Sequence, residues 1–196
     1  MLKTVFGLLA VLISLPGYVI YVRNTFRGTT KPQFYSWLIW GTLAAIGFSS
    51  QLVSGAGPGS WVTGVTVLGC GVIAILALFR GEKKLSSTDK VLLLLSAVAV
   101  AIRVFSDNPL QALILAVFAA LIGYVFTSKK AYYNPQHETV LTYVLNSVKF
   151  FPSLFALNTV SKLTFIYPFS MMLANAWLAG LIMYRKKVLL DNKPKA

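Results

Sequence analysis

Long apolar stretches dominate the chain and alternate with short polar segments. Most have about 20 residues, the length of an α-helix that crosses a hydrocarbon core of about 30 Å. Backbone groups in a bilayer must be hydrogen-bonded internally, and strands of about ten alternating residues, typical of membrane barrels, are not seen. The pattern therefore predicts an all-α integral membrane protein. Seven stretches are bounded by charge, Gly, Pro or Asn: 4–22, 34–53, 61–79, 91–105, 109–127, 139–157 and 163–184.

The fourth stretch, 91–105, has only 15 residues and carries Arg103 near its end, so six helices are the alternative. The basic residues decide between the two. With seven helices and the N-terminus outside, the inner segments hold three, four, two and five Lys or Arg residues, 14 of the 18 in the chain. Without the fourth helix, Lys129 and Lys130 would share a side with Lys162, and the basic tail would lie outside, against the positive-inside rule. We therefore predict seven helices and a cytoplasmic C-terminus.

Composition supports a membrane protein. Of the 196 residues, 57% are hydrophobic and 12% are charged, about half the charged fraction of a soluble domain. The net charge of +13 lies in loops and the tail, which indicates orientation in the membrane and not nucleic-acid binding. The single cysteine, Cys70, rules out an internal disulfide, and we expect it to be a small packing residue. We interpret the N-terminal apolar run as the first helix, not as a signal peptide.

Aromatic residues lie near the ends of several stretches, as interfacial anchors do. Their positions agree with the predicted orientation. The cytoplasmic ends are flanked by Tyr18, Tyr21, Trp37, Trp40, Tyr124 and Tyr184, and the outer ends by Trp61 and Tyr167.

Two pairs of landmarks suggest an internal repeat. Pro32-Gln33 follows the first stretch and Pro135-Gln136 follows the fifth, 103 positions later, and both follow basic segments. Phe79-Arg80 and Tyr184-Arg185 close the third and seventh stretches, 105 positions apart. A single helix between two triplets gives both triplets the same orientation, a 3+1+3 parallel-repeat bundle. The predicted division is residues 1–80 for the first triplet, 81–108 for the linker helix, 109–187 for the second triplet and 188–196 for a basic cytoplasmic tail.

This plan resembles the SWEET/SemiSWEET sugar transporters and the wider PQ-loop family. The stretch from Leu15-Pro16-Gly17-Tyr18 to Arg27-Gly28-Thr29-Thr30-Lys31 is similar to the family's helix-one proline followed by a basic loop. The resemblance implies small-solute transport. The segments RGTTKPQFYSWLIW (27–40), AYYNPQHET (131–139) and MMLANAWLAGLIMYRKK (171–187) also resemble bacterial membrane proteins without an assigned activity, which implies the bacterial inner membrane.

The chain departs from the family in its prolines. The family's Pro-Gln pair lies inside the first helix of each triplet, whereas Pro16 is followed by Gly17 and the fifth stretch has no proline after Pro109. The literal Pro-Gln pairs fall in loops, where we expect them to begin the second and sixth helices. A symmetric hinge is therefore not expected. The candidate hinge residues are Pro16, Gly17 and Pro152.

Lys149 is the leading candidate for a functional residue, because an ionisable side chain at bilayer depth is costly. It is the eleventh of 19 residues in the sixth stretch. Asn146 and Ser153 share its helical face, and Pro152 removes a backbone donor nearby. Together they predict a polar cluster at the bilayer midplane. The alternative is a structural lysine held by carbonyl groups and water.

Asn175, between Ala174 and Ala176, is the second candidate. The resemblance to SWEET proteins, in which an asparagine on the third helix of a triplet lines the pocket, implies that Asn175 contacts the substrate. The 105-residue offset makes Cys70 its counterpart in the first triplet, so the site would be asymmetric. The alternative for Asn175 is an interhelical hydrogen bond without a ligand.

Other polar residues are assigned structural roles. His137 titrates near neutral pH, but with Glu138 it lies at the predicted start of the sixth helix, where capping and dipole effects explain both. We expect Arg103 to reach the outer interface and pair with Asp107. The run from Gly55 to Gly59 is an external turn, since no strand precedes it and no phosphate-binding lysine follows.

We expect an alternating-access transporter for a small polar solute, sugar-like or a small organic metabolite. The alternative is a non-transporting receptor, chaperone or assembly factor, because the fold alone does not decide function. No nucleophile–base pair or metal-ligand cluster is visible, so we expect no enzyme activity, no cofactor and no metal. The expected partners are the substrate and the lipid bilayer, not nucleic acid, and a homo-oligomer is compatible with the sequence.

Overall fold

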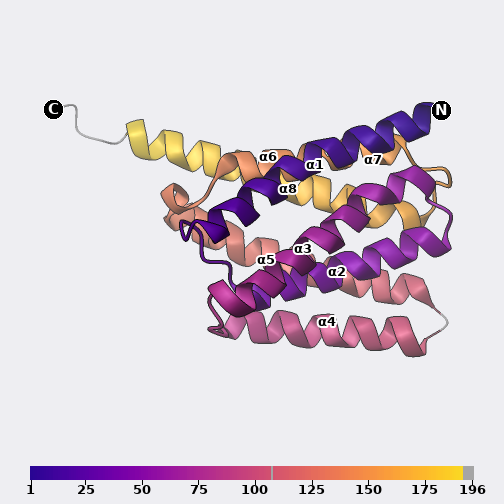
Figure 1. Ribbon diagram of the computed structural model, residues 1–196, viewed down its shortest axis with the longest axis horizontal. Coiled ribbons are helices and arrows are strands. Elements are labelled where there is room, and N and C mark those ends of the chain that lie inside the picture. The colour runs from indigo at the N-terminus through magenta and orange to yellow at the C-terminus, as the bar shows by residue number, and fades with distance from the viewer. Residues whose placement is uncertain (107, 192–196) are drawn as a thin grey trace.

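The computed structural model describes residues 1–106 and 108–191, and every regular element in these ranges is helical (Figure 1). The fold class is therefore all-α, as predicted. The elements are α1 (Leu2–Phe26), α2 (Phe34–Val53), η1 (Gly57–Ser60), α3 (Trp61–Arg80), α4 (Ser87–Phe105), α5 (Pro109–Tyr133), η2 (Pro135–His137), α6 (Val140–Val148), α7 (Phe150–Phe155) and α8 (Lys162–Asp191).

Five helical segments of the described chain are long and apolar enough to cross a membrane: α1, α2, η1 with α3, α5 and α8. The outward faces of these helices are apolar. In α1, for example, Val5, Leu12 and Val19 are each more than half exposed. A contiguous apolar surface of this kind is unfavourable in water and favourable against lipid. These helices indicate a membrane protein.

The helices form an elongated bundle (Figure 1), in which α3 lies between α1 and α2, and α8 lies between α5 and the pair α6 and α7. The first half of the chain comprises α1 to α3, and the second half comprises α5 to α8. In the first half, α3 packs against α1 and α2. In the second half, α8 packs against α5 and against α6 with α7. The halves meet where α1 packs on α6 and α7, and where α2 packs on α5. Helix α4 lies at the edge of the bundle, against α5 and α2.

The sixth stretch is interrupted, where the sequence predicts one continuous helix over 139–157. Helix α6 ends at Val148 and α7 begins at Phe150, with Lys149 between them. Pro152 explains this position. A proline has no N–H to donate to the carbonyl four residues earlier, here that of Val148, and its ring clashes with that carbonyl. Pro152 thus ends α6 one residue before the only lysine of this stretch.

The loops at the end of the bundle that carries the basic residues are fastened differently in the two halves. In the first half, the α1–α2 and α3–α4 loops pair through their backbones: Phe34 N–H donates to Glu82 O at 2.9 Å, and Glu82 N–H donates to Pro32 O at 2.8 Å. In the second half, an ion pair joins Lys130 Nζ and a Glu138 carboxylate oxygen at 3.1 Å. Lys186 Nζ donates to the Glu138 carbonyl at 2.8 Å.

The Pro-Gln pairs correct one prediction. Helix α2 begins at Phe34, and the side chain of Gln33 caps it by accepting from Ser36 N–H. The first pair therefore precedes its helix directly. The second pair instead forms the separate 3-10 turn η2, and α6 begins at Val140. The asymmetry arises because the chain at 135–139 turns before it enters the bundle.

Small residues let the helices pack closely in the centre. Gly47 of α2 lies against the ring of Tyr167 of α8, and a Cβ atom at Gly47 would come within 2.6 Å of that ring. Tyr167 is 3% exposed and also packs edge-on against Phe150. Tyr167 lies near the start of α8, as the sequence predicts, but its ring is part of the core. Its ring fills the bundle core because α2 offers no side chain at Gly47.

Candidate functional site

Lys149 is buried where α1, α3 and the α6–α7 junction meet. Its side chain is 2% exposed. The ammonium nitrogen donates to Thr66 Oγ1 at 3.1 Å and lies 3.5 Å from the Tyr18 hydroxyl. It also lies 5.4 Å from the centroid of the Tyr18 ring and 5.1 Å from that of Phe150, within cation–π range. Each of these contacts stabilises the charged form of the side chain.

The neighbouring helix leaves room for this arrangement. Gly69 of α3 has no side chain, and the Tyr18 ring occupies that space, since a Cβ atom there would come within 2.5 Å of the ring. Cys70 follows Gly69 and is 3% exposed. The Tyr18 hydroxyl and Thr66 both contact the ammonium of Lys149, so the three side chains form one polar group.

No carboxylate faces Lys149 among the side chains that the structure describes. The one ion pair in that set joins Lys130 to Glu138 at the basic end of the bundle. The carboxylate of Asp89 accepts from Ser86 and from Gln33 at the start of α4. The partners of Lys149 are thus neutral hydroxyl groups and aromatic rings.

Asn175 of α8 is buried and makes polar contacts with Tyr124 of α5 and with its own helix. Its side chain is 3% exposed, and Nδ2 donates to the Tyr124 hydroxyl at 2.6 Å and to the Met171 carbonyl at 2.8 Å. The Tyr124 ring packs edge-on against Trp40 of α2, with the ring centroids 5.3 Å apart. The next residue of α2, Gly41, lies against Cys70, since a Cβ atom there would come within 3.2 Å of the Cys70 Cβ. Tyr124 and Cys70 thus both pack against the same part of α2.

Two predicted neighbours of Lys149 do not join it. Ser153 is fully buried, but its hydroxyl donates to the Phe150 carbonyl at 2.7 Å. Asn146 is half-buried on α6, and no hydrogen bond of its side chain is described. The Ser153 hydroxyl is thus satisfied within its own helical turn, and the described hydrogen bonds of Lys149 go to Thr66 and Tyr18 instead.

Sequence reasoning missed the actual partners. Tyr18 and Tyr124 are predicted only to flank cytoplasmic helix ends, whereas their hydroxyl groups contact Lys149 and Asn175. Thr66 is not predicted at all. A hydroxyl-bearing residue in the middle of an apolar stretch was the available signal for Thr66, and the 106-residue spacing of the two tyrosines was the signal for both of them.

The candidate hinge positions lie in different settings. Helix α1 continues through Pro16 and Gly17, both exposed on the outer face, and nothing lies within 4 Å of the space where a Gly17 Cβ would be. Pro152 is buried beside the α6–α7 break. Of the three positions, Pro152 alone coincides with an interruption of a helix.

The contacts of the peripheral residues also differ from those predicted. Arg103 Nε donates to Ser49 Oγ of α2 at 3.1 Å, and Asp107, its predicted partner, lies outside the described residues. The side chain of His137 is likewise outside the described part. Glu138 does not cap α6, because its carboxylate pairs with Lys130 and accepts from the Tyr143 hydroxyl at 2.7 Å.

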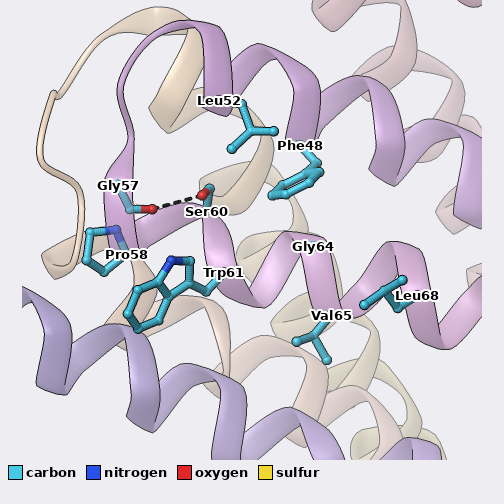
Figure 2. A pocket seen from close by; sticks show the side chains of 9 residues that line it. All are labelled: Phe48, Leu52, Gly57, Pro58, Ser60, Trp61, Gly64, Val65 and Leu68. Atoms are coloured by element: carbon cyan, nitrogen blue, oxygen red, sulfur yellow. Dashed lines mark hydrogen bonds between the residues drawn. The ribbon is translucent and has the colours of Figure 1, made fainter.

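Two open apolar grooves lie on the outer surface along α3, and Lys149 lines neither. One, of about 710 Å³, runs beneath the α2–α3 turn, where Ser60 Oγ donates to the Gly57 carbonyl and the Trp61 ring covers one side (Figure 2). The other, of about 480 Å³, lies between α1 and α3 and includes the Tyr18 ring. Tyr18 therefore separates an apolar outer groove from the buried ammonium.

Within residues 1–106 and 108–191, no group of three or more His, Cys, Asp or Glu side chains could hold a metal ion. No family model, curated protein or solved structure matches the chain. The chemistry of the site is therefore the basis for assigning a function.

Proposed function

We propose that the protein is a small-solute transporter of the cytoplasmic membrane that works by alternating access. Seven transmembrane segments would cross the bilayer as two triplets and the linker α4, with the basic end of the bundle in the cytoplasm. The observation that carries the proposal is the buried ammonium of Lys149, which the second triplet supplies and the hydroxyl groups of Thr66 and Tyr18 in the first triplet hold. A buried ionisable group in a membrane bundle is by default a functional-site candidate.

The order of the helices supports the two-triplet arrangement. In each half the third helix separates the first from the second, α3 between α1 and α2, and α8 between α5 and α6. The contacts between the halves are also reciprocal. The first helix of one half packs on the second helix of the other, α1 on α6 and α5 on α2. A two-fold axis along the membrane normal generates this pattern.

The burial of individual residues supports the same symmetry. Each buried residue of α1 has a buried counterpart in α5 at an offset of 106: Gly7 and Leu113, Ala10 and Ala116, Ser14 and Ala120, Thr25 and Ala131. Each buried residue of α3 has a buried counterpart in α8 at an offset of 105: Val62 and Tyr167, Thr63 and Pro168, Cys70 and Asn175, Ile73 and Leu178, Ala74 and Ala179, Ala77 and Ile182.

Side-chain contacts repeat at the same two offsets. Arg80 donates from Nη1 to the Phe26 carbonyl at 3.1 Å and lies over that ring, 5.1 Å from its centroid. Arg185 donates from Nε to the Tyr132 carbonyl at 2.9 Å and lies over that ring at 4.1 Å. The two tyrosines repeat as well. The Tyr18 ring lies against Gly69, next to Cys70, and Tyr124 accepts from Asn175. Tyr18 and Tyr124 are 106 positions apart, and Cys70 and Asn175 are 105 apart. Duplicated contacts favour two structurally equivalent bodies.

The position of Lys149 suits a site between two moving bodies. Rocking one triplet against the other changes the distance from Lys149 to Thr66 and Tyr18, because these groups lie on different triplets. In the structure these contacts occupy the ammonium, and Lys149 is 2% exposed to solvent. A solute that replaces Thr66 and Tyr18 as the partner of Lys149 would be released when those contacts form again.

The test is transport by the purified full-length protein in vesicles, with uptake and efflux measured against a broad metabolite panel. We expect at least one small solute to move in the wild type and not in Lys149→Met. If no solute moves while the protein remains folded, the transporter is refuted, and a receptor, chaperone or assembly factor becomes the better interpretation.

A further inference from the structure

The ammonium of Lys149 is a buried positive charge that the described residues leave uncompensated. Its hydrogen-bond partners, Thr66 and Tyr18, are neutral hydroxyl groups. An isolated charge away from water is unfavourable unless it is paired. An ammonium group has three N–H donors, so two hydroxyl partners leave one donor for a ligand.

The repeat places no second cation opposite the first. At the 103-residue offset that relates α2 to α6, Ile46 corresponds to Lys149, and both are buried, at 4% and 2% exposure. The polar contact of the other half, between Asn175 and Tyr124, is neutral. The centre of the bundle therefore has one cationic side and one neutral side.

We propose that the solute bound beside Lys149 is a monovalent anion, either a small organic carboxylate or an inorganic anion such as chloride; this rests on the transporter function proposed above. One negative charge neutralises the ammonium, whereas a second negative charge in the same site would be buried without a partner. The Tyr18 hydroxyl can turn from accepting from Lys149 to donating to the anion, because a hydroxyl group does both. The Thr66 hydroxyl keeps its donation to the Val62 carbonyl at 2.8 Å and orients the ammonium. A neutral sugar would leave the ammonium unpaired.

Cys70 provides a direct probe of this charge preference. It is the only cysteine of the chain and it is buried. On α3 it lies one helical turn after Thr66, the residue to which Lys149 donates. Two methanethiosulfonate reagents of similar size, bearing a sulfonate or a trimethylammonium group, and the smaller uncharged methyl reagent would be applied to the full-length protein in membranes. Modification of Cys70 is followed by intact-protein mass spectrometry.

We expect the sulfonate reagent to modify Cys70 at least about tenfold faster than the trimethylammonium reagent, since a unit charge at close range in a partly dry site outweighs thermal energy. Lys149→Met should abolish this preference. Lys162→Met removes one charge from an exposed position on α8 and should leave the preference intact. Equal rates, a faster cationic reagent, or a preference that survives in Lys149→Met would overturn the inference. So would failure of all three reagents, because no solute from water would then reach the site.

Protection experiments identify the kind of anion. L-lactate, chloride and glucose would each be tested for slowing the modification of Cys70. Protection by lactate alone indicates an organic carboxylate, and protection by chloride at similar concentration indicates an inorganic anion. Protection by glucose alone would overturn the inference. Anion-selective labelling without any transport would refute the transporter but not the anion site. Transport of a neutral solute, without a preference for the anionic reagent, would refute the anion site but not the transporter.

Discussion

Arg185 lies over the ring of Tyr132 and donates a hydrogen bond to the carbonyl oxygen of the same residue. The pair ties the basic end of α8 to the end of α5. Arg80 and Phe26 tie α3 to α1 in the same way. A guanidinium group suits this double contact because its plane stacks on the ring while its edge donates to the carbonyl.

Replacing Arg185 should loosen the contact between α8 and the end of α5. We expect Arg185→Leu to lower the free energy of unfolding by about 1 kcal/mol, from the lost cation–π contact and hydrogen bond. Arg185→Lys should recover only part of this, because an ammonium has no stacking plane. Thermal unfolding in detergent measures the change. Lys187→Leu, at an exposed position two residues on, is the control, and an equal loss there would contradict the prediction.

Replacing Lys149 should separate a functional role from a structural one. Lys149→Met keeps most of the side-chain volume and removes a buried charge, so we expect the thermal midpoint in detergent to stay constant or rise. Transport should fall by about tenfold or more, and Lys149→Arg should not restore it, because a guanidinium group presents different donors. If Lys149 is structural, the methionine variant should instead lose yield or stability while the remaining protein transports normally.

The contact between Gly47 and Tyr167 predicts a sharp difference between two glycine substitutions. Gly47→Ala would place a methyl group within 2.6 Å of the Tyr167 ring, and overpacking of this kind costs about 1–3 kcal/mol. Gly17→Ala meets nothing within 4 Å and should be neutral or slightly stabilising, because alanine favours the helix. Thermal unfolding of the two variants should therefore diverge. Equal stability would mean that α2 and α8 are not packed this closely.

The charge distribution predicts the orientation of the chain. Reporter fusions after Lys84, after Lys130 and at the C-terminus should all report the cytoplasm, since these segments hold most of the basic residues. A reporter that is active outside the cytoplasm when fused at the C-terminus would refute the seven-segment topology. The three fusions are measured in the same strain, so that the reporter activity at the C-terminus is compared directly with that after Lys84 and after Lys130.

The bounds of the helices could largely be predicted from the sequence, because apolar length and charged flanks act locally. All seven predicted stretches contain helix, and α2 begins and ends at the predicted residues. The break at Lys149 was not predicted. Pro152 indicates that one hydrogen bond is lost, but whether the helix bends or stops there depends on packing against α1 and α3.

The site was only partly predictable. A lysine and an asparagine within apolar stretches were sufficient to identify Lys149 and Asn175 as buried polar groups, and both are buried. Their partners were not predictable from helical spacing, because Thr66, Tyr18 and Tyr124 come from other helices. Long-range contacts of this kind depend on how helices rotate against one another, which a single sequence leaves open.

The two halves should respond differently to ionic strength. Backbone hydrogen bonds between Glu82 and residues Pro32 and Phe34 fasten the loops of the first half, and mobile ions do not screen such bonds appreciably. The corresponding place in the second half depends on Lys130 and Glu138, and the Lys130 side chain is 62% exposed to solvent, so added salt weakens the pair. High salt should therefore weaken the Lys130–Glu138 pair and leave the segment at Glu138 to the hydrogen bond from Lys186, while the backbone pairing at Glu82 persists. The two loop regions would then differ in their sensitivity to electrolyte.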